Sequence, residues 1–234
     1  MPQKVHCAVT QVIDHGERVY SVSLQPDSLA PRFRAGQFLH LALDPYTPGD
    51  FWPDSRIFSI ASSPDDRSTV SITYAVKGQF TSRMESELQV GRQVWVKLPY
   101  GEFIINPKHD VCLLAGGTGI TAFTAFLTGL QADYPHNVYL FYGARRPDLL
   151  IYRSLVESAA AKCSKLHPYF LAEQGEPDGF ISGRISVEHI WQNLPNPEEM
   201  VYYLSGPPIM LKTLSAALTE RCIPSTQILT DAWE

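Results

Sequence analysis

Short runs in which apolar and polar residues alternate fill roughly the first hundred positions of the chain. Turn material rich in glycine, proline and aspartate separates these runs, and one short helix is predicted near Thr81–Leu88. Six strands of this kind predict a closed antiparallel, Greek-key barrel, which we assign to residues 1–104. The predicted strands are Val5–Ile13, Arg18–Leu24, Gln37–Leu43, Arg56–Ala61, Thr69–Val76 and Gln93–Leu98.

From Val111 the pattern changes to apolar strands that alternate with helices. This alternation predicts a doubly wound, five-stranded parallel sheet over residues 105–234, which binds ligands at the carboxyl ends of its strands. The predicted strands are Val111–Ala115, Asn137–Tyr142, Leu166–Leu171, Met200–Leu204 and Gln227–Leu229. The helices predicted between them are Ile120–Leu130, Leu149–Ala161, Ser186–Asn193 and Pro208–Glu220.

A glycine-rich turn, Gly116-Gly117-Thr118-Gly119, follows the first of these later strands directly. Glycines there allow the backbone to approach a phosphate, and the start of the next helix offers free N–H groups and a positive dipole end. Glycine turns after strands also occur for packing reasons. On these residues alone, a nucleotide site and a purely structural turn both remain open.

A second element, Arg56-Ile57-Phe58-Ser59, lies about sixty residues upstream in an alternating stretch. Arg56 and Phe58 share one face of this strand, and Ile57 and Ser59 share the other. An arginine fork fits a pyrophosphate, an aromatic ring can stack on a flavin, and a hydroxyl can bond a ring nitrogen. An amphipathic strand with a surface arginine is the alternative, but the two elements together favour a nucleotide site.

Composition agrees with a globular protein that has a substantial core. The 234 residues are 44% hydrophobic and 18% charged, and the formal net charge is −5. This charge gives no attraction to nucleic acid or to an anionic membrane. The segment 1–6 has no apolar signal core, and the uncharged window 111–130 is typical of a buried strand followed by a helix. We therefore expect a cytoplasmic protein without membrane insertion.

The four cysteines, Cys7, Cys112, Cys163 and Cys222, are widely separated and form no pair spaced for a zinc or iron–sulfur site. The histidines likewise form no pair with ligand spacing. We predict no metal site and isolated thiols in a reducing compartment.

Further motifs follow the two elements described above, and taken in order they resemble the ferredoxin–NADP reductase-like family of flavin reductases. The resemblance covers nearly the whole chain, and it is the order of the motifs that makes it specific. The further motifs are Gly78-Gln79-Phe80-Thr81-Ser82, Pro99-Tyr100-Gly101-Glu102-Phe103, Tyr142-Gly143-Ala144-Arg145, Ser205-Gly206-Pro207-Pro208-Ile209-Met210 and Asp231-Ala232-Trp233-Glu234.

The resemblance implies an FAD site in the barrel. Arg56 would bind the pyrophosphate, Phe58, in place of the commoner tyrosine, would stack on the isoalloxazine, and Ser59 would act as the catalytic residue near flavin N5. Thr81 and the backbone around it would hold the diphosphate. The remaining residues implied at this site are Ile57, Tyr74, Val76, Gly78, Gln79, Phe80 and Ser82.

The resemblance also implies an NAD(P)H site in the parallel sheet. Thr118 and its neighbours would face the pyrophosphate, and the turn after Ser205 would line the nicotinamide end. Ser205 stands where many relatives have a cysteine. Trp233 would either cover the flavin or anchor the tail, and Asp231 could approach the flavin. The residues implied at this site are Gly117, Thr118, Gly119, Ile120, Arg145, Ser205, Gly206, Pro207 and Met210.

Three functions remain open on this evidence. The first is a reductase that passes hydride from NAD(P)H to bound FAD and electrons to a separate acceptor protein or small acceptor. The second uses free flavin as a substrate, and the third is a non-catalytic flavin- or nucleotide-sensing subunit. Arg145, Arg146 and Arg184 could each pair with a 2′-phosphate, so the sequence leaves NADH and NADPH open, as it does the oligomeric state.

Overall fold

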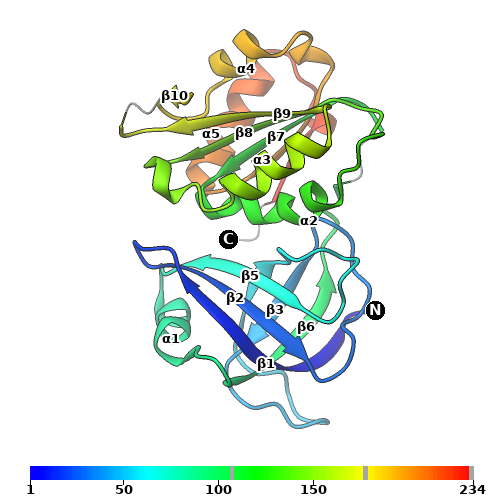
Figure 1. The fold of residues 1–234 in the computed structure, drawn as a ribbon, viewed down its shortest axis with the longest axis vertical. Helices are drawn as coiled ribbons and strands as arrows, with labels where there is room; N and C mark the ends of the chain where they lie inside the picture. The colour runs from blue at the N-terminus through cyan, green and yellow to red at the C-terminus, as the bar shows by residue number, and fades with distance from the viewer. Residues whose placement is uncertain (106–107, 176–178, 232–234) are drawn as a thin grey trace. The chain divides into compact units, whose positions relative to one another are not determined.

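The computed structural model describes residues 1–105, 108–175 and 179–231, and the chain divides into two compact units, Met1–Ile105 and Asn106–Glu234 (Figure 1). The first unit is a six-stranded antiparallel sheet with the strand order β4-β3-β6-β1-β2-β5. Its elements are β1 Gln3–Asp14, β2 Val19–Pro26, β3 Phe38–Ala42, β4 Ser55–Ser59, β5 Val70–Ala75, α1 Gln79–Glu87 and β6 Gln93–Tyr100.

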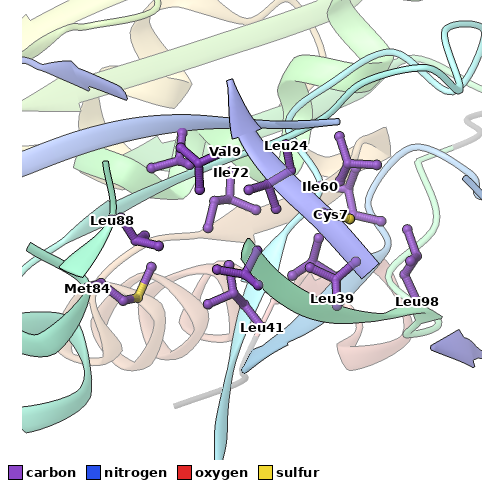
Figure 2. Packing of buried hydrophobic residues seen from close by; sticks show 14 of the residues in the cluster. Cys7, Val9, Leu24, Leu39, Leu41, Ile60, Ile72, Met84, Leu88 and Leu98 are labelled. Carbon is purple, nitrogen blue, oxygen red and sulfur yellow. The ribbon is translucent and has the colours of Figure 1, made fainter. Parts of the chain in front are cut away.

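The two edge strands of this sheet meet and nearly close it into a barrel. Just after β4, the amide of Ala61 donates a hydrogen bond of 2.8 Å to the carbonyl of Ser71 in β5. Inward-pointing side chains from every strand fill the interior, and α1 adds Met84, which is fully buried (Figure 2). The predicted barrel is thus confirmed.

The hairpin between β1 and β2 is tied to α1 and to the end of β5. Glu17 and Arg18 both have positive φ angles, of 48° and 61°, in the tight turn. Arg18 donates to the carboxylate of Glu85 through Nε and Nη2, and its carbonyl accepts from the amide of Val76 at 3.0 Å. These contacts fix the short segment that joins β5 to α1.

The second unit is a parallel sheet with the strand order β10-β9-β8-β7-β11-β12. Its strands are β7 Val111–Gly116, β8 Val138–Ala144, β9 Leu166–Ala172, β10 Ile181–Ser182, β11 Val201–Ser205 and β12 Ile228–Thr230. The parallel sheet is confirmed, but the described residues contain a sixth strand beyond the five predicted. The additional strand, β10, has two residues, which is too few for any periodicity to show in the sequence.

Helices cover both faces of this sheet. α4 Val187–Asn193 and α5 Pro208–Glu220 pack on the face that carries Cys112, Leu114 and Phe141. α2 Thr121–Gly129 and α3 Arg153–Lys162 lie on the opposite face (Figure 1). The sheet is therefore doubly wound, and the order of its strands reverses between β7 and β11.

The uncharged window 111–130 folds as β7, the short 3-10 helix Gly117–Ile120 and the nine-residue α2. None of the helices in the described ranges combines the length and apolar character that crossing a bilayer requires.

Two loops meet at the point where the strand order reverses, and glycines make their close approach possible. A Cβ atom at Gly119, after β7, would lie 2.3 Å from the carbonyl oxygen of Ser205 and 2.6 Å from the amide nitrogen of Gly206, after β11. A Cβ at Gly116 would lie 2.5 Å from the sulfur of Met210, and Gly206 has a φ of +153°. At Gly119 backbone therefore packs on backbone, and at Gly116 the side chains of Met210 and Pro207 occupy the space that a side chain would need.

We predict that Gly119→Ala destabilises the protein by about 1–3 kcal/mol, because the added methyl group forces Ser205 or its own loop to move. Urea unfolding followed by circular dichroism measures the change. Gly129→Ala is the matched control, since its Cβ would meet no atom within 4 Å. Equal midpoints for Gly119→Ala and the parent protein would contradict the packing described above.

Candidate functional site

The pairing of β4 with β3 decides where the predicted flavin residues point. Arg56 lies opposite Leu41 and Phe58 opposite Leu39, and both leucines are fully buried in the barrel core. Directly paired residues of antiparallel strands share a face. Arg56 and Phe58 therefore project from the core side of β4, at the edge of the sheet.

Phe58 is half-buried and packs against the core. Its ring lies 6.1 Å from that of Tyr74, which stacks on Tyr20 at 5.6 Å. Burial raises the pKa of Tyr74 above its usual range, so its hydroxyl stays protonated. Tyr20, Phe58 and Tyr74 thus form a continuous row of contacting rings. The stacking of Phe58 on a flavin stays a prediction.

Ile57 and Ser59 lie on the other face of β4, opposite His40 and Phe38. Phe38 stacks on Tyr100 with ring centroids 5.6 Å apart. Ser59 is the last residue of β4, so it lies at the end of the strand and on the face opposite Arg56. Its predicted catalytic role rests on the resemblance alone.

The structure brings the two predicted flavin elements together at Arg56. The guanidinium carbon lies 5.2 Å from the ring centroid of Phe80, the second residue of α1. The Nη1 group of Arg56 also donates to the carboxylate of Asp54 and to the carbonyl of Ser55, both at 2.9 Å. An arginine fork therefore lies beside the first turn of a helix, which is a favourable arrangement for a phosphate group.

The hydroxyl of Thr81 shapes the turn before α1. It accepts hydrogen bonds from the amides of Lys77 and Gly78, at 2.9 and 3.1 Å. The amide of Ser82 donates to the carbonyl of Gly78 and so belongs to the helix ladder. A diphosphate at this turn would meet the backbone amides of the first turn, beginning at the exposed Gln79, because these have no acceptor within the helix.

Val76 and Tyr74 were predicted to offer backbone contacts. The amide of Val76 already donates to the carbonyl of Arg18, so only its carbonyl remains for a ligand. Tyr74 lies opposite Tyr20 in the pairing of β5 with β2, in the same register as the bond between Val76 and Arg18, so its backbone N–H and C=O face β2 and not a ligand.

In the second unit, the predicted phosphate loop divides into two parts. Gly117 and Thr118 are half-exposed, and a Cβ at Gly117 would meet no atom within 4 Å. Gly119 packs on Ser205, and Ile120 is fully buried. Open space for a ligand thus lies at Gly117 and Thr118, whereas a contact with Ile120 would come from its backbone.

Ser205 ends β11 and is bonded to the C-terminal segment. Its hydroxyl donates to the carboxylate of Asp231 at 2.9 Å, and the Asp231 amide donates to the carbonyl of Leu204 at 2.8 Å. Next along the chain, Pro207 and Met210 pack against Gly116. A carboxylate therefore lies beside the predicted nicotinamide-binding turn. Trp233 lies outside the described residues.

Three arginines were predicted as possible partners of a 2′-phosphate, and two of them hold carboxylates. Arg146 donates from Nε and Nη2 to Asp148, and this bond lowers the pKa of Asp148. Arg184 donates to Glu173 at 2.8 Å. Arg145 is exposed at the first position after β8.

These carboxylates were not among the residues predicted from the sequence. Asp54 and Asp148 each lie two positions from their arginine, and Asp54 precedes Arg56 where the chain enters β4, so strand alternation places these two side chains on one side. Asp148 instead lies in the 3-10 helix Pro147–Leu149, so alternation could have identified only the first pair. Glu173 and Arg184 are eleven positions apart and meet because they follow β9 and β10, which pair in parallel with Ala172 opposite Ser182, so local sequence gave no signal.

Within the described ranges, no cluster of three or more histidine, cysteine or acidic side chains is arranged to hold a metal ion. Cys7, Cys112 and Cys163 are buried free thiols, and Cys222 is exposed.

Comparison with known proteins shows that this chain is similar to several oxidoreductases. Residues 113–216 match the oxidoreductase NAD-binding domain family. The chain is 26% identical over 244 residues to the reductase component of propane 2-monooxygenase from Mycolicibacterium smegmatis, covering 93% of this chain and 69% of that protein. It is 27% identical over 252 residues to oxidoreductase NAD-binding domain-containing protein 1 from Danio rerio, covering 96% and 90% of the two chains.

Among solved structures, a cytochrome P450 reductase from Amycolatopsis is similar in fold, with a TM-score of 0.85 at 20% identity. The match covers 99% of this chain and 70% of that one. Residues 113–216 therefore match an oxidoreductase NAD-binding domain, and the chain as a whole has the fold of this cytochrome P450 reductase.

Proposed function

We propose that this chain is an NAD(P)H-dependent flavoprotein reductase that transfers hydride from the nicotinamide to bound FAD and passes electrons to a separate acceptor protein. The observation that carries the proposal is the meeting of Arg56 with Phe80, which joins the two elements predicted to bind flavin. The match of residues 113–216 to an oxidoreductase NAD-binding domain supplies the nucleotide-binding partner for that site.

The residues of the first unit fit FAD better than FMN. A diphosphate offers two negatively charged groups, and two separate elements here suit them: the guanidinium of Arg56 and the first turn of α1. FMN has a single phosphate and would leave one element without a partner. Bound FAD supplies a hydride acceptor that can release its electrons one or two at a time.

In the second unit, we assign the coenzyme pyrophosphate to Gly117 and Thr118, where the loop leaves open space. We assign the nicotinamide to the turn that follows Ser205. The carboxylate of Asp231, held by the Ser205 hydroxyl, would favour the positively charged, oxidised ring over the neutral, reduced one. The residues of the chain thus bind and orient the coenzyme, and this mode of catalysis requires no acid–base triad.

A separate acceptor protein is proposed because the similar protein from Mycolicibacterium smegmatis is the reductase component of a monooxygenase. We further propose a cytoplasmic location, which three buried free thiols support, since reducing compartments preserve such thiols. A second candidate function uses flavin as a diffusible substrate. It is favoured by the exposure of the Arg56 side chain, of which 55% is accessible to solvent.

The first experiment tests the function itself. We expect the purified protein to be yellow, to release FAD and not FMN on denaturation, and to oxidise NADH or NADPH in the presence of an artificial electron acceptor. Absorbance and chromatography of the released flavin measure the first two outcomes. A colourless protein that micromolar FAD does not saturate would favour free flavin as the substrate. Absence of NAD(P)H oxidation would exclude a reductase.

A second prediction concerns Arg56. Replacing it with alanine should weaken FAD binding by about 1.5–3 kcal/mol, or about one to two decades in affinity, because a charge-assisted phosphate contact is lost. Titration of the apoprotein with FAD measures the change, and Arg32→Ala, an exposed arginine outside the flavin elements, is the control. Unchanged FAD affinity in Arg56→Ala would remove Arg56 from the site.

A third prediction concerns coenzyme choice. Arg146 and Arg184 already donate to carboxylates, so Arg146→Ala and Arg184→Ala should each keep the NADPH/NADH ratio of kcat/KM within about threefold of the parent. Steady-state kinetics with both coenzymes measure the ratio. A loss of about ten- to hundredfold in NADPH use with NADH use intact would instead identify that arginine as the 2′-phosphate ligand.

A further inference from the structure

Arg56 is paired with a carboxylate on its own strand segment. Nη1 donates to Asp54 Oδ1 at 2.9 Å, and the two side chains are 55% and 61% exposed. Among the described hydrogen bonds of Arg56, the donor is Nη1, so Nε and Nη2 retain their donors for another acceptor. The guanidinium thus has an acidic neighbour at the position from which it would bind a phosphate.

The loop before β4 is anchored on the barrel, and this anchoring places Asp54 beside Arg56. The Trp52 indole donates to the Ser55 hydroxyl at 3.0 Å. The ring of Trp52 lies 5.6 Å from that of Tyr46, which in turn lies 5.2 Å from the ring of Trp95 on β6. The residues on both sides of Asp54 are therefore held in place.

A carboxylate and a phosphate accept from the same donors, and two anions beside one guanidinium repel each other. We propose that Asp54 competes with the FAD diphosphate for Arg56 and so weakens the binding of FAD. This inference rests on the proposed function and deepens it, because it names a residue that lowers the affinity of the site for flavin.

If Asp54 has the opposite role and helps Arg56 to bind the phosphate, the FAD affinity of the variant changes in the opposite direction. A carboxylate can orient an arginine toward a ligand, in which case its charge strengthens binding by fixing the fork. The effect of removing the charge on FAD affinity therefore has a different sign in the two cases. Exposed ion pairs of this kind contribute little, so the change is expected to be small but measurable.

The test is Asp54→Asn, which keeps the size of the side chain and removes its charge. The apoprotein of the parent and of the variant is titrated with FAD and with riboflavin, which has no phosphate. We expect FAD to bind about two- to fivefold more tightly to the variant, equivalent to about 0.4–1 kcal/mol, and riboflavin to bind equally to both. Asp50→Asn is the matched control: it removes the same charge from the same loop, and the described contacts of Asp50 include no arginine.

Unchanged or weaker FAD binding in Asp54→Asn, with binding by the parent intact, would overturn the competition and leave the proposed function standing. Equal tightening in Asp50→Asn would also overturn it, because the effect would then come from net charge. Absence of FAD binding in every variant would overturn both the inference and the proposed function. Asp54→Ala provides a second variant, and circular dichroism confirms that each protein is folded.

Discussion

The register of β4 against β3 is the constraint on which the candidate flavin site depends. Because Leu39 and Leu41 are buried, the residues paired with them must face the core side, and these are Phe58 and Arg56. A shift of one residue would exchange the two faces of β4 and turn both side chains away from α1. Core packing therefore determines the cation–π contact between Arg56 and Phe80 at the edge of the barrel.

In the second unit, close packing also positions part of the candidate site, but here it is packing of backbone and not of side chains. The glycine-rich turn after β7 was predicted to serve a phosphate, and the structure assigns part of it to packing. Gly119 touches Ser205, whereas Gly117 leaves open space on its side. The packing interpretation of the turn thus holds at Gly119, whereas phosphate binding at Gly117 stays a prediction. One short motif combines a structural contact with a candidate binding surface.

Local patterns were enough to predict the strands and helices, because alternation and helical periodicity repeat over several residues. They failed for β10, whose two residues are too few to show a period. The residues of the candidate site likewise divide into those that local sequence could predict and those that depend on contacts between distant positions. Arg56 could be predicted from its strand, whereas the contact of Gly119 with Ser205 joins positions far apart in the chain and leaves no local trace. Thr81 was predicted for the diphosphate, but nothing in its motif indicated that its hydroxyl bonds the turn itself.

The meeting of the loops after β7 and β11 also limits how this protein can change in evolution. Gly119 and Gly206 are already the smallest residues available, so a larger residue on one loop cannot be compensated by a smaller one on the other. A substitution on either loop is therefore constrained by the backbone of the other, and side-chain changes meet less resistance at exposed neighbours such as Ile209, which is 69% exposed.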